Sequence, residues 1–392
     1  MTNASRFQNS PIGQLVPIRV VLGDQVWEHQ AFVPDPLPRT VELSQKTWTI
    51  VTEASSALAR LDGAGRRLPN PYLLVRPAIT REAVSSSALE GTYAELQDVL
   101  QAELLDDNNV LDAATAEVRN YVLAAERGLE MIETLPVSRR VLTETHGILM
   151  RGSRGDHAEV GAFRRRQNWI GSRARAPVTE ALFVPPPPGE TLERGIDDWE
   201  RWVNDRSITL PTVVKTALAH YQFEALHPFI DGNGRIGRLV VVLTFIAAGD
   251  LAIPLLNVSP FFERARDEYI DHLRTVSETG DFEPWVAFFA EAVRVQAQLG
   301  LTKAEELIGV RDQITQRLRD VGVRGTAIRI AENIIGYPVT TVARAAEQSG
   351  VSYESANSAV GRLVDEGVLH EITGGNYRRV FVAQEVLDII NR

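Results

Sequence analysis

Between positions 227 and 238 the chain reads His227-Pro228-Phe229-Ile230-Asp231-Gly232-Asn233-Gly234-Arg235-Ile236-Gly237-Arg238. Glycines such as Gly232 and Gly234 let the backbone adopt conformations closed to other residues, so successive amides can point into one concavity and hold an anion. The apolar run 239–248 that follows predicts a buried core helix, whose N-terminus favours negative charge at the same place. The stretch therefore predicts a phosphate-binding loop that leads directly into a core helix.

The side chains of this segment suit the same ligand. Arg235 and Arg238 are three residues apart, so they share a helix face, and guanidinium groups suit phosphate oxygens. Asp231 offers one hard oxygen ligand, which fits a magnesium ion otherwise held by phosphates and water. His227 adds an imidazole, the side chain that titrates near neutral pH. Together they predict a site for nucleotide phosphates, Mg²⁺, and a base for an incoming hydroxyl.

The segment also permits other interpretations. A histidine before proline, a Gly-Asn-Gly turn and a pair of arginines on a solvated face each occur for structural reasons alone, but all of them within twelve residues favour a site. Residues 232–237 also match the GxGxxG of dinucleotide-binding folds. That motif follows a buried strand, whereas a helical pattern over 211–226 precedes it here. A Walker A loop is excluded, because the chain has no GxxxxGK(S/T).

The segment resembles the signature of the Fic family, HxFx(D/E)GNGRxxR, and matches it at every position. The resemblance covers about residues 40–295 and implies a mainly α fold: a Fic-type helical bundle with a small β-hairpin flap. It implies a protein adenylyltransferase, in which His227 deprotonates a Ser, Thr or Tyr hydroxyl of a target protein that then attacks the α-phosphorus of ATP and expels pyrophosphate. Asp231 would bind Mg²⁺, and Phe229 would point inward. The implied nucleotide-binding residues are Gly232, Asn233, Gly234, Arg235, Gly237 and Arg238.

The same resemblance assigns a hairpin at 161–170, with the strand after it, to a flap that registers the target segment; Asn168 and Trp169 are its candidate residues. Residues 259–269 are similar to the Fic stretch that closes the adenosine pocket, where Tyr269 is either a nucleotide contact or a packed aromatic. From the sequence itself, four consecutive prolines at 185–188 predict an extended surface segment. Transfer of another group, such as UMP or phosphate, is a further possibility, but the intact signature favours ATP.

Ser86, Glu90 and Gly91 resemble the inhibitory motif of Fic proteins, (S/T)xxxE(G/N). Ser86 and Glu90 are four residues apart and share a helix face. A carboxylate that reached Arg238 would neutralise the charge meant for the γ-phosphate of ATP, and autoinhibition would follow. The same carboxylate would also suit positioning a water that removes AMP, so both directions of the reaction stay open. The structural alternative is an ordinary exposed glutamate.

Five parts are expected along the chain: an irregular or β-rich segment (1–40), a helical region with the inhibitory helix (41–110), the catalytic core (111–295), a linker helix (296–321) and a winged helix-turn-helix (322–392). The first long helix is predicted over 47–61 and ends at the turn 62–65. In the last part, helices at 341–348 and 353–365, with Ser352 as an N-cap, precede a hairpin over 368–382. That order is typical of a winged helix.

The last part holds seven arginines and eight carboxylates. DNA affinity depends on phosphate contacts from a basic face, so DNA binding is possible but not favoured over protein interaction or homodimerisation. The alternative function of the whole chain is a nucleotide-sensing transcriptional regulator that uses this winged helix.

The composition limits the classes of site. The 392 residues carry a net charge of −10 and no cysteine, which excludes disulfides, thiolate metal sites and cysteine nucleophiles. Residues 1–13 lack the apolar core of a secretory signal, and the apolar run 239–248 is far shorter than the roughly 20 residues that span a bilayer. We expect a cytoplasmic protein without a membrane partner.

Overall fold

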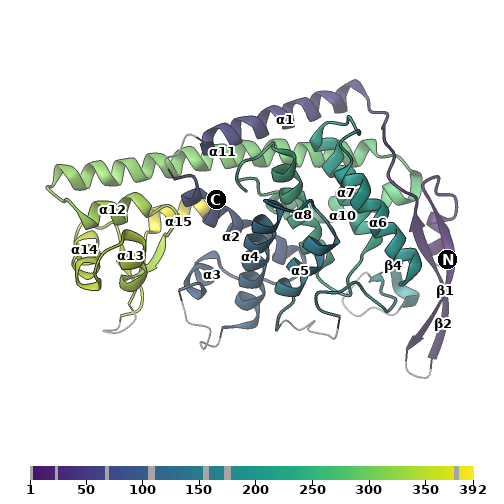
Figure 1. Cartoon of the computed structure of the whole chain (residues 1–392), viewed down its shortest axis with the longest axis horizontal. Coiled ribbons are helices and arrows are strands. Elements are labelled where there is room, and N and C mark those ends of the chain that lie inside the picture. The colour runs from purple at the N-terminus through teal and green to yellow at the C-terminus, as the bar shows by residue number, and fades with distance from the viewer. Residues whose placement is uncertain are drawn as a thin grey trace. The chain divides into compact units, whose positions relative to one another are not determined.

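The computed structural model describes residues 3–22, 25–66, 70–104, 111–152, 159–171, 178–374 and 379–392. These residues are mainly helical with three small antiparallel sheets, which confirms the fold class expected from the sequence (Figure 1). The chain divides into two units. The first comprises Met1–Ala57, Leu123–Asp250 and Val258–Val295, and the second comprises Leu58–Val122, Leu251–Asn257 and Gln296–Arg392. The five-part division made from the sequence stays a prediction.

The first unit is built around α7 (Thr212–Leu226) and α8 (Asn233–Ala248), which pack against each other (Figure 1). Most residues of both helices are buried, and the prediction of a core helix at 239–248 is confirmed, although its last two residues are exposed. Two buried tryptophans donate their indole N–H groups to carbonyls of α7: Trp199 to Ala219 at 2.9 Å and Trp285 to Ala217 at 2.8 Å. These bonds satisfy the polar atom of each large ring inside the core.

The other elements of this unit pack against that pair or against one another. They are the 3₁₀ turn Asn3–Phe7, β1 (Gly13–Leu22), β2 (Gln25–Pro34), α5 (Arg139–Leu149), β3 (Ile170–Gly171), β4 (Ala181–Phe183), α6 (Glu190–Asn204), α9 (Ser259–Arg264) and α10 (Arg266–Thr279). Three long helices, α1 (Gln45–Arg66), α4 (Ala113–Ile132) and α11 (Glu283–Asp320), contribute residues to both units.

The N-terminal hairpin joins the segment that follows β4. Strands β1 and β2 pair along their whole length, from Gly13 opposite Pro34 to Leu22 opposite Gln25. The amide of Phe32 donates to the carbonyl of Val184 at 2.8 Å, and the Phe32 ring packs with those of Phe7 and Phe183. The hairpin is therefore attached to the region that the sequence assigned to the flap.

The predicted end of the first helix at 62–65 is wrong, because α1 continues to Arg66. Gly65 allows a close approach: a Cβ there would lie 2.9 Å from Leu255 and 3.2 Å from Ile253. Asp62 accepts a hydrogen bond from the amide of Ala252 at 2.7 Å. The Asp-Gly-Ala-Gly composition thus serves a tertiary contact with the segment 252–255 rather than a turn.

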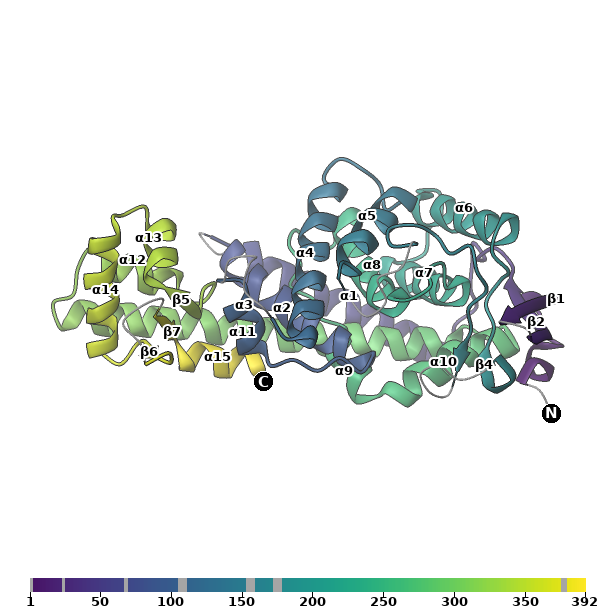
Figure 2. The same ribbon diagram turned by 90° about the horizontal axis from the view of Figure 1, so that it is seen from below.

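The second unit holds α2 (Tyr72–Leu89), α3 (Leu96–Ala102) and a C-terminal module. The module comprises α12 (Thr326–Asn333), β5 (Val339–Thr341), α13 (Val342–Ser349), α14 (Tyr353–Asp365), β6 (His370–Glu371), β7 (Val380–Val382) and α15 (Gln384–Asn391), with strand order β5-β7-β6 (Figure 2). The helix predicted at 353–365 is confirmed, and the Ser352 side chain caps it by accepting from the Ser355 amide. The turn predicted at Gly375 and Asn376 lies outside the described residues.

Among the residues that the structure describes, no helix is both long enough and apolar enough to cross a membrane.

Candidate functional site

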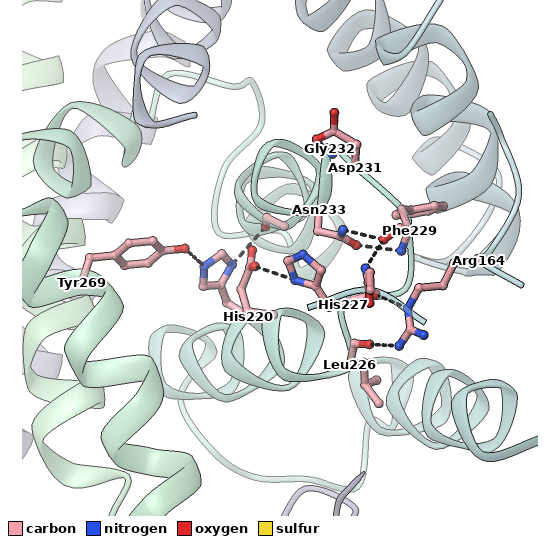
Figure 3. Close-up of polar contacts among 12 residues, drawn as sticks. Arg164, His220, Leu226, His227, Phe229, Asp231, Gly232, Asn233 and Tyr269 are labelled. Carbon is pink, nitrogen blue, oxygen red and sulfur yellow. Dashed lines mark hydrogen bonds and ion pairs between the residues drawn. The ribbon is translucent and has the colours of Figure 1, made fainter. Parts of the chain in front are cut away.

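His227 ends α7 and turns the chain into the signature loop. Its backbone is left-handed (φ 46°, ψ 60°), and within the described part of the chain it is the one non-glycine residue with positive φ. Its amide still donates to the Phe223 carbonyl at 3.0 Å. A left-handed non-glycine residue costs about 1–3 kcal/mol, so its surroundings must impose the conformation. The imposed conformation sets the direction of the His227 side chain (Figure 3).

Arg164 supplies much of that constraint. Its Nε donates to the His227 carbonyl at 2.9 Å, its Nη2 to the Leu226 carbonyl at 3.4 Å, and its amide to the Pro228 carbonyl at 2.9 Å (Figure 3). The side chain is 2% exposed, and burial lowers the pKa of Arg164 to about 9, which leaves it a cation at pH 7. Charge-assisted bonds to successive carbonyls hold the peptide planes on both sides of His227.

Sequence reasoning missed Arg164. It is the first of three consecutive arginines, and nothing local separates it from Arg165 and Arg166, which are exposed. The position directly after Phe163, at the edge of an apolar stretch, is the only signal that the sequence offers.

Asn233 closes the loop on itself. Its Oδ1 accepts from the Phe229 amide and its Nδ2 donates to the Phe229 carbonyl, both at 2.8 Å. Asn168, a predicted flap residue, donates its Nδ2 to the same carbonyl at 2.8 Å. Phe229 itself is fully buried, as the resemblance implied. Asn233 therefore shapes the loop from within, and Asn168 joins the flap to it.

His146 of α5 supports the loop from the other side. Its ring stacks on Phe229 with centroids 3.8 Å apart. Its Nδ1 accepts from the Gly161 amide at 3.0 Å, so the other ring nitrogen, Nε2, is the donor to the Asp231 carbonyl at 3.1 Å. Burial lowers the pKa of His146 to about 4, so the ring is neutral at pH 7. Its role is structural, and nothing in the sequence predicts that role.

Gly232 is the N-cap of α8 and adopts a left-handed conformation (φ 75°). A Cβ at this position would lie 2.8 Å from Met150 Sδ, so any larger residue would be both strained and crowded. Gly234 lies in the first turn of α8. The loop therefore delivers the N-terminal amides of a sixteen-residue helix to the place where the sequence predicts phosphates.

Arg235 and Arg238 are both buried, at 4% and 1% exposed. Arg235 Nη2 lies 3.5 Å from Met150 Sδ. Burial of two guanidiniums one turn apart excludes the solvated helix face that was the structural alternative. A cation held away from water gains much from a charged partner, so the pair suits an anionic ligand.

Asp231 is exposed at the mouth of the loop, and its Oδ1 accepts from the Gly232 amide at 2.6 Å. The described residues contain no group of three or more His, Asp or Glu side chains arranged to hold a metal. A single exposed carboxylate fits Mg²⁺, which commonly takes one or two carboxylates and completes its shell with phosphates and water.

The His227 ring lies near a carboxylate of its own helix. Nδ1 of His227 is 4.0 Å from Oε2 of Glu224, and the side chains are 19% and 12% exposed (Figure 3). A partly buried carboxylate at this distance stabilises a positive charge on the imidazole. The arrangement suits a histidine that accepts a proton during a reaction.

Two predicted nucleotide-binding residues lie in packed surroundings. Gly237 faces α7, where a Cβ would lie 2.3 Å from Glu224 Oε1. Tyr269 is 5% exposed, stacks on Phe262 at 4.6 Å, and donates its hydroxyl to His220 at 2.7 Å. His220 in turn donates its Nδ1–H to the Gly237 carbonyl at 3.1 Å. This geometry favours packing for both residues, and their contact with a nucleotide stays a prediction.

The flap differs in detail from its prediction. Residues 163–169 form no strand, and the pairing joins β3 to β4 instead. The predicted surface position of the proline segment is wrong for Pro185 and Pro186, which are buried because their carbonyls accept hydrogen bonds from Gln167 and Arg164. Trp169 packs against a small cluster, Ala31, Ala181 and Val184, so it joins the flap to the N-terminal hairpin.

The proposed inhibitory residues lie at the end of α2 in the second unit. Ser86 is fully buried in its last turn, Glu90 is the exposed C-cap, and Gly91 follows with φ 85°. A carboxylate at a helix C-terminus is disfavoured by the helix dipole, by about 0.3–1 kcal/mol. Glu90 therefore occupies a position that helix stability does not favour. That the Glu90 carboxylate contacts Arg238 stays a prediction.

Known proteins resemble the chain in both sequence and fold. The model of the Fic/DOC family N-terminal region matches residues 48–130, and the Fic/DOC family model matches residues 136–244. The protein adenylyltransferase Fic of Drosophila yakuba is 28% identical over 283 residues, which cover 69% of this chain and 50% of that protein. The Drosophila melanogaster protein of the same name is 27% identical, with 69% and 51% covered.

Two solved structures share the fold. A Fic family protein from Desulfovibrio desulfuricans G20 aligns with a TM-score of 0.55 and 19% identity, covering 88% of this chain and 98% of that one. A Fic domain containing signaling protein from Bacteroides thetaiotaomicron VPI-5482 aligns with a TM-score of 0.51 and 20% identity, covering 65% and 98%. The chain spans about half the length of the curated relatives it matches. On its signature, its fold and these matches, the chain belongs to the Fic/DOC family.

Proposed function

We propose that this chain is a protein adenylyltransferase that moves AMP from ATP to a Ser, Thr or Tyr hydroxyl of a target protein. The observation that carries the proposal is the signature loop, which places His227 and the buried Arg235 and Arg238 around the N-terminus of α8. The activity named for the Drosophila relatives supports the same reaction.

The reaction follows from these residues. His227 accepts the proton of the target hydroxyl, and Glu224 stabilises the imidazolium that forms. The hydroxyl oxygen then bonds to the α-phosphorus of ATP while the bond to the pyrophosphate oxygen breaks. The α8 N-terminus and the two arginines stabilise the charge that develops on the departing pyrophosphate. Asp231 would hold Mg²⁺, whose charge would neutralise phosphate oxygens.

The test uses two labels. Protein incubated with α-phosphate-labelled ATP and Mg²⁺ should become labelled, whereas γ-phosphate-labelled ATP should leave it unlabelled. Label from the γ-position would show phosphate transfer instead and overturn the proposal. Competition by unlabelled UTP as effective as that by ATP would overturn the choice of adenine.

Asp231→Asn should raise the Mg²⁺ concentration for half-maximal labelling by more than about tenfold, because a neutral amide is a poor ligand for a hard cation. Labelling rates are measured across a magnesium titration. Asp267→Asn is the matched control, since the Asp267 side chain is fully exposed. An unchanged magnesium requirement in Asp231→Asn would remove Asp231 from the metal site.

Arg164→Lys should slow labelling by about ten- to a hundredfold, because an ammonium donates from a single nitrogen and cannot reproduce the separate Nε and Nη2 bonds to the carbonyls of His227 and Leu226, so the base loses its position. ATP affinity should change little, since the loop amides are held separately by Asn233. Labelling kinetics and ATP binding are measured together with thermal unfolding. Arg166→Lys, on the exposed neighbour, is the control. Equal losses of rate and ATP affinity in Arg164→Lys would mean that the residue only supports the fold.

We also propose that Glu90 inhibits the site by neutralising Arg238, with Ser86 and Gly91 shaping the end of α2 that presents it. Gly91 supports this role, because its left-handed backbone ends the helix directly after Glu90. A carboxylate at the same place suits orienting a water against an AMP-modified hydroxyl, so AMP removal is the reverse activity to look for.

DNA binding by the winged-helix module is not proposed. Three of its arginines lie near carboxylates of the module itself: Arg344 is 2.8 Å from Glu347, Arg362 is 2.7 Å from Glu366, and Arg379 is 3.7 Å from Glu371. These pairs reduce the positive potential that DNA phosphates require. A cytoplasmic location, a homodimer and the boundaries of the five parts are retained as proposals.

A further inference from the structure

A pocket in the second unit lies against the inhibitory helix α2. Its cavity volume is about 50 Å³, and it is open to solvent. Four of its lining residues come from α2, and the others come from the segment 255–257, α11 and α15. The apolar ones are Leu74, Pro77, Ala78, Leu255, Ala304, Leu307 and Ile390. Mainly apolar walls with a small number of polar groups are typical of small-molecule sites.

Two cations line this apolar space. Arg81 is half-buried, and its Nε is shielded from solvent without a hydrogen-bond partner in the described part of the chain. Lys303 of α11 donates to the Ile390 carbonyl of α15 at 3.3 Å. A guanidinium whose shielded Nε has no acceptor favours an anion, and its geometry suits the two oxygens of a carboxylate. The chemistry of the pocket is thus apolar along its walls and cationic at Arg81.

Helix α2, which contributes one wall of the pocket, lacks one backbone hydrogen bond and has several side-chain polar groups without hydrogen-bond partners in the part of the chain that the structure describes. Pro77 lies inside α2 and has no amide hydrogen, so it makes no hydrogen bond to the Leu73 carbonyl. Two to three turns further on, the hydroxyls of Ser85 and Ser87 are buried and make no hydrogen bond among the described residues. Each buried unsatisfied hydroxyl costs about 1–3 kcal/mol. The stability of α2 therefore depends on the surfaces that pack against it.

The C-terminal module supplies part of that packing. Gly336 approaches Leu73 so closely that a Cβ would lie 2.7 Å from its Cδ2, and the Arg76 guanidinium lies over the Tyr337 ring, 5.0 Å from its centre. Helix α15 contacts α2 (Figure 1). The pocket is thus at the junction of the inhibitory helix with α11 and α15, and a ligand there would bridge all three.

We propose that this pocket binds an amphiphilic anion, a carboxylate on a short aliphatic chain, and that binding strengthens the inhibition by Glu90. The apolar chain would cover Leu74 and Pro77, and the carboxylate would pair with Arg81. A ligand that binds the formed helix stabilises it by mass action, so α2 would hold Glu90 at its C-terminus for a larger fraction of the time. The effect of the ligand on inhibition rests on the proposed function of Glu90, whereas the binding of the ligand to the pocket does not.

Binding is tested on the full chain by calorimetric titration with octanoate. Octyl phosphate should bind as well, because it shares the anion and chain, whereas octanol and acetate should bind at least about tenfold more weakly, since each lacks one half of the ligand. Arg81→Gln should lower the affinity for octanoate by about tenfold or more. If Arg81→Gln unfolds, Lys303→Gln is measured in its place. Arg329→Gln, on an exposed arginine of α12, should bind as wild type does. Equal octanoate affinity in wild type and Arg81→Gln would overturn the site.

Coupling is tested by labelling with α-phosphate-labelled ATP in the presence of octanoate. The wild-type rate should fall severalfold, and the rate of Glu90→Gly should stay the same. An unchanged or raised wild-type rate, or an equal fall in Glu90→Gly, would overturn the coupling. If Glu90→Gly labels no faster than wild type without octanoate, the proposed inhibition fails, while the calorimetric result still decides the binding site.

Discussion

Replacing His227 with alanine is expected to abolish labelling from α-phosphate-labelled ATP, with a loss of at least about a hundredfold, while ATP binding stays close to that of the wild type. A general base contributes about 10²–10⁴-fold, and removal of the imidazole leaves the proton of the target hydroxyl without an acceptor. ATP affinity is retained because the loop shape depends on the backbone of His227, held by Arg164, and on the Asn233 side chain, not on the ring.

A second variant is needed because the backbone of His227 is left-handed. Alanine at a left-handed position destabilises the loop, whereas asparagine tolerates that conformation better. His227→Asn should therefore be as inactive as His227→Ala and unfold at a higher temperature. His272→Ala, on a half-exposed histidine of α10, should label like the wild type. Tight ATP binding with unchanged labelling in both His227 variants would sink the assignment of the base.

Replacing Glu90 with glycine should raise both the labelling rate and ATP affinity, by about tenfold or more. Coupling between an inhibitory group and a ligand is typically worth 5–150-fold. Once the Glu90 carboxylate is removed, the positive charge of Arg238 would no longer be neutralised and could pair with the γ-phosphate. Labelling rates and ATP dissociation constants are measured for the wild type and the variant, and Glu90→Gly with His227→Ala should show no label.

Glu90→Gln separates charge from flexibility, since glutamine keeps the size of the side chain and removes only its charge. A gain in Glu90→Gln close to that in Glu90→Gly would assign the inhibition to the carboxylate. A gain confined to the glycine variant would assign it to the backbone beside Gly91. No gain in rate or in affinity for either variant would remove Glu90 from the control of the site.

Much of the candidate site could be predicted because its parts are local in sequence. The twelve residues from His227 to Arg238 form one loop and the first turns of one helix, so spacing alone brings His227, Asp231 and the two arginines together. The helices of the C-terminal module could be predicted from the sequence in the same way. Caps such as Ser352 and glycines such as Gly350 and Gly367 mark helix ends through local backbone preferences.

Contacts between distant segments could not be predicted in this way. Helix α1 continues through residues 62–65, whose sequence is typical of a turn. It does so because segment 252–255 packs against Gly65 and the amide of Ala252 donates a hydrogen bond to Asp62. The proline segment is buried where its carbonyls meet Arg164 and Gln167, although four prolines in a row usually lie at the surface. Tyr269 became part of an aromatic core through His220, 49 residues away along the chain.

The sequence by itself determined the family, the mainly helical fold and the set of reactive groups, because a contiguous motif and helix periodicity are readable without tertiary information. Only the tertiary structure decided which of three adjacent arginines holds His227 in place, that His146 is a neutral support beneath the loop, and that α2 borders a cationic apolar pocket. The reason is physical: burial and desolvation fix the role of a charged or aromatic side chain, and they depend on neighbours that the chain brings together only when it folds.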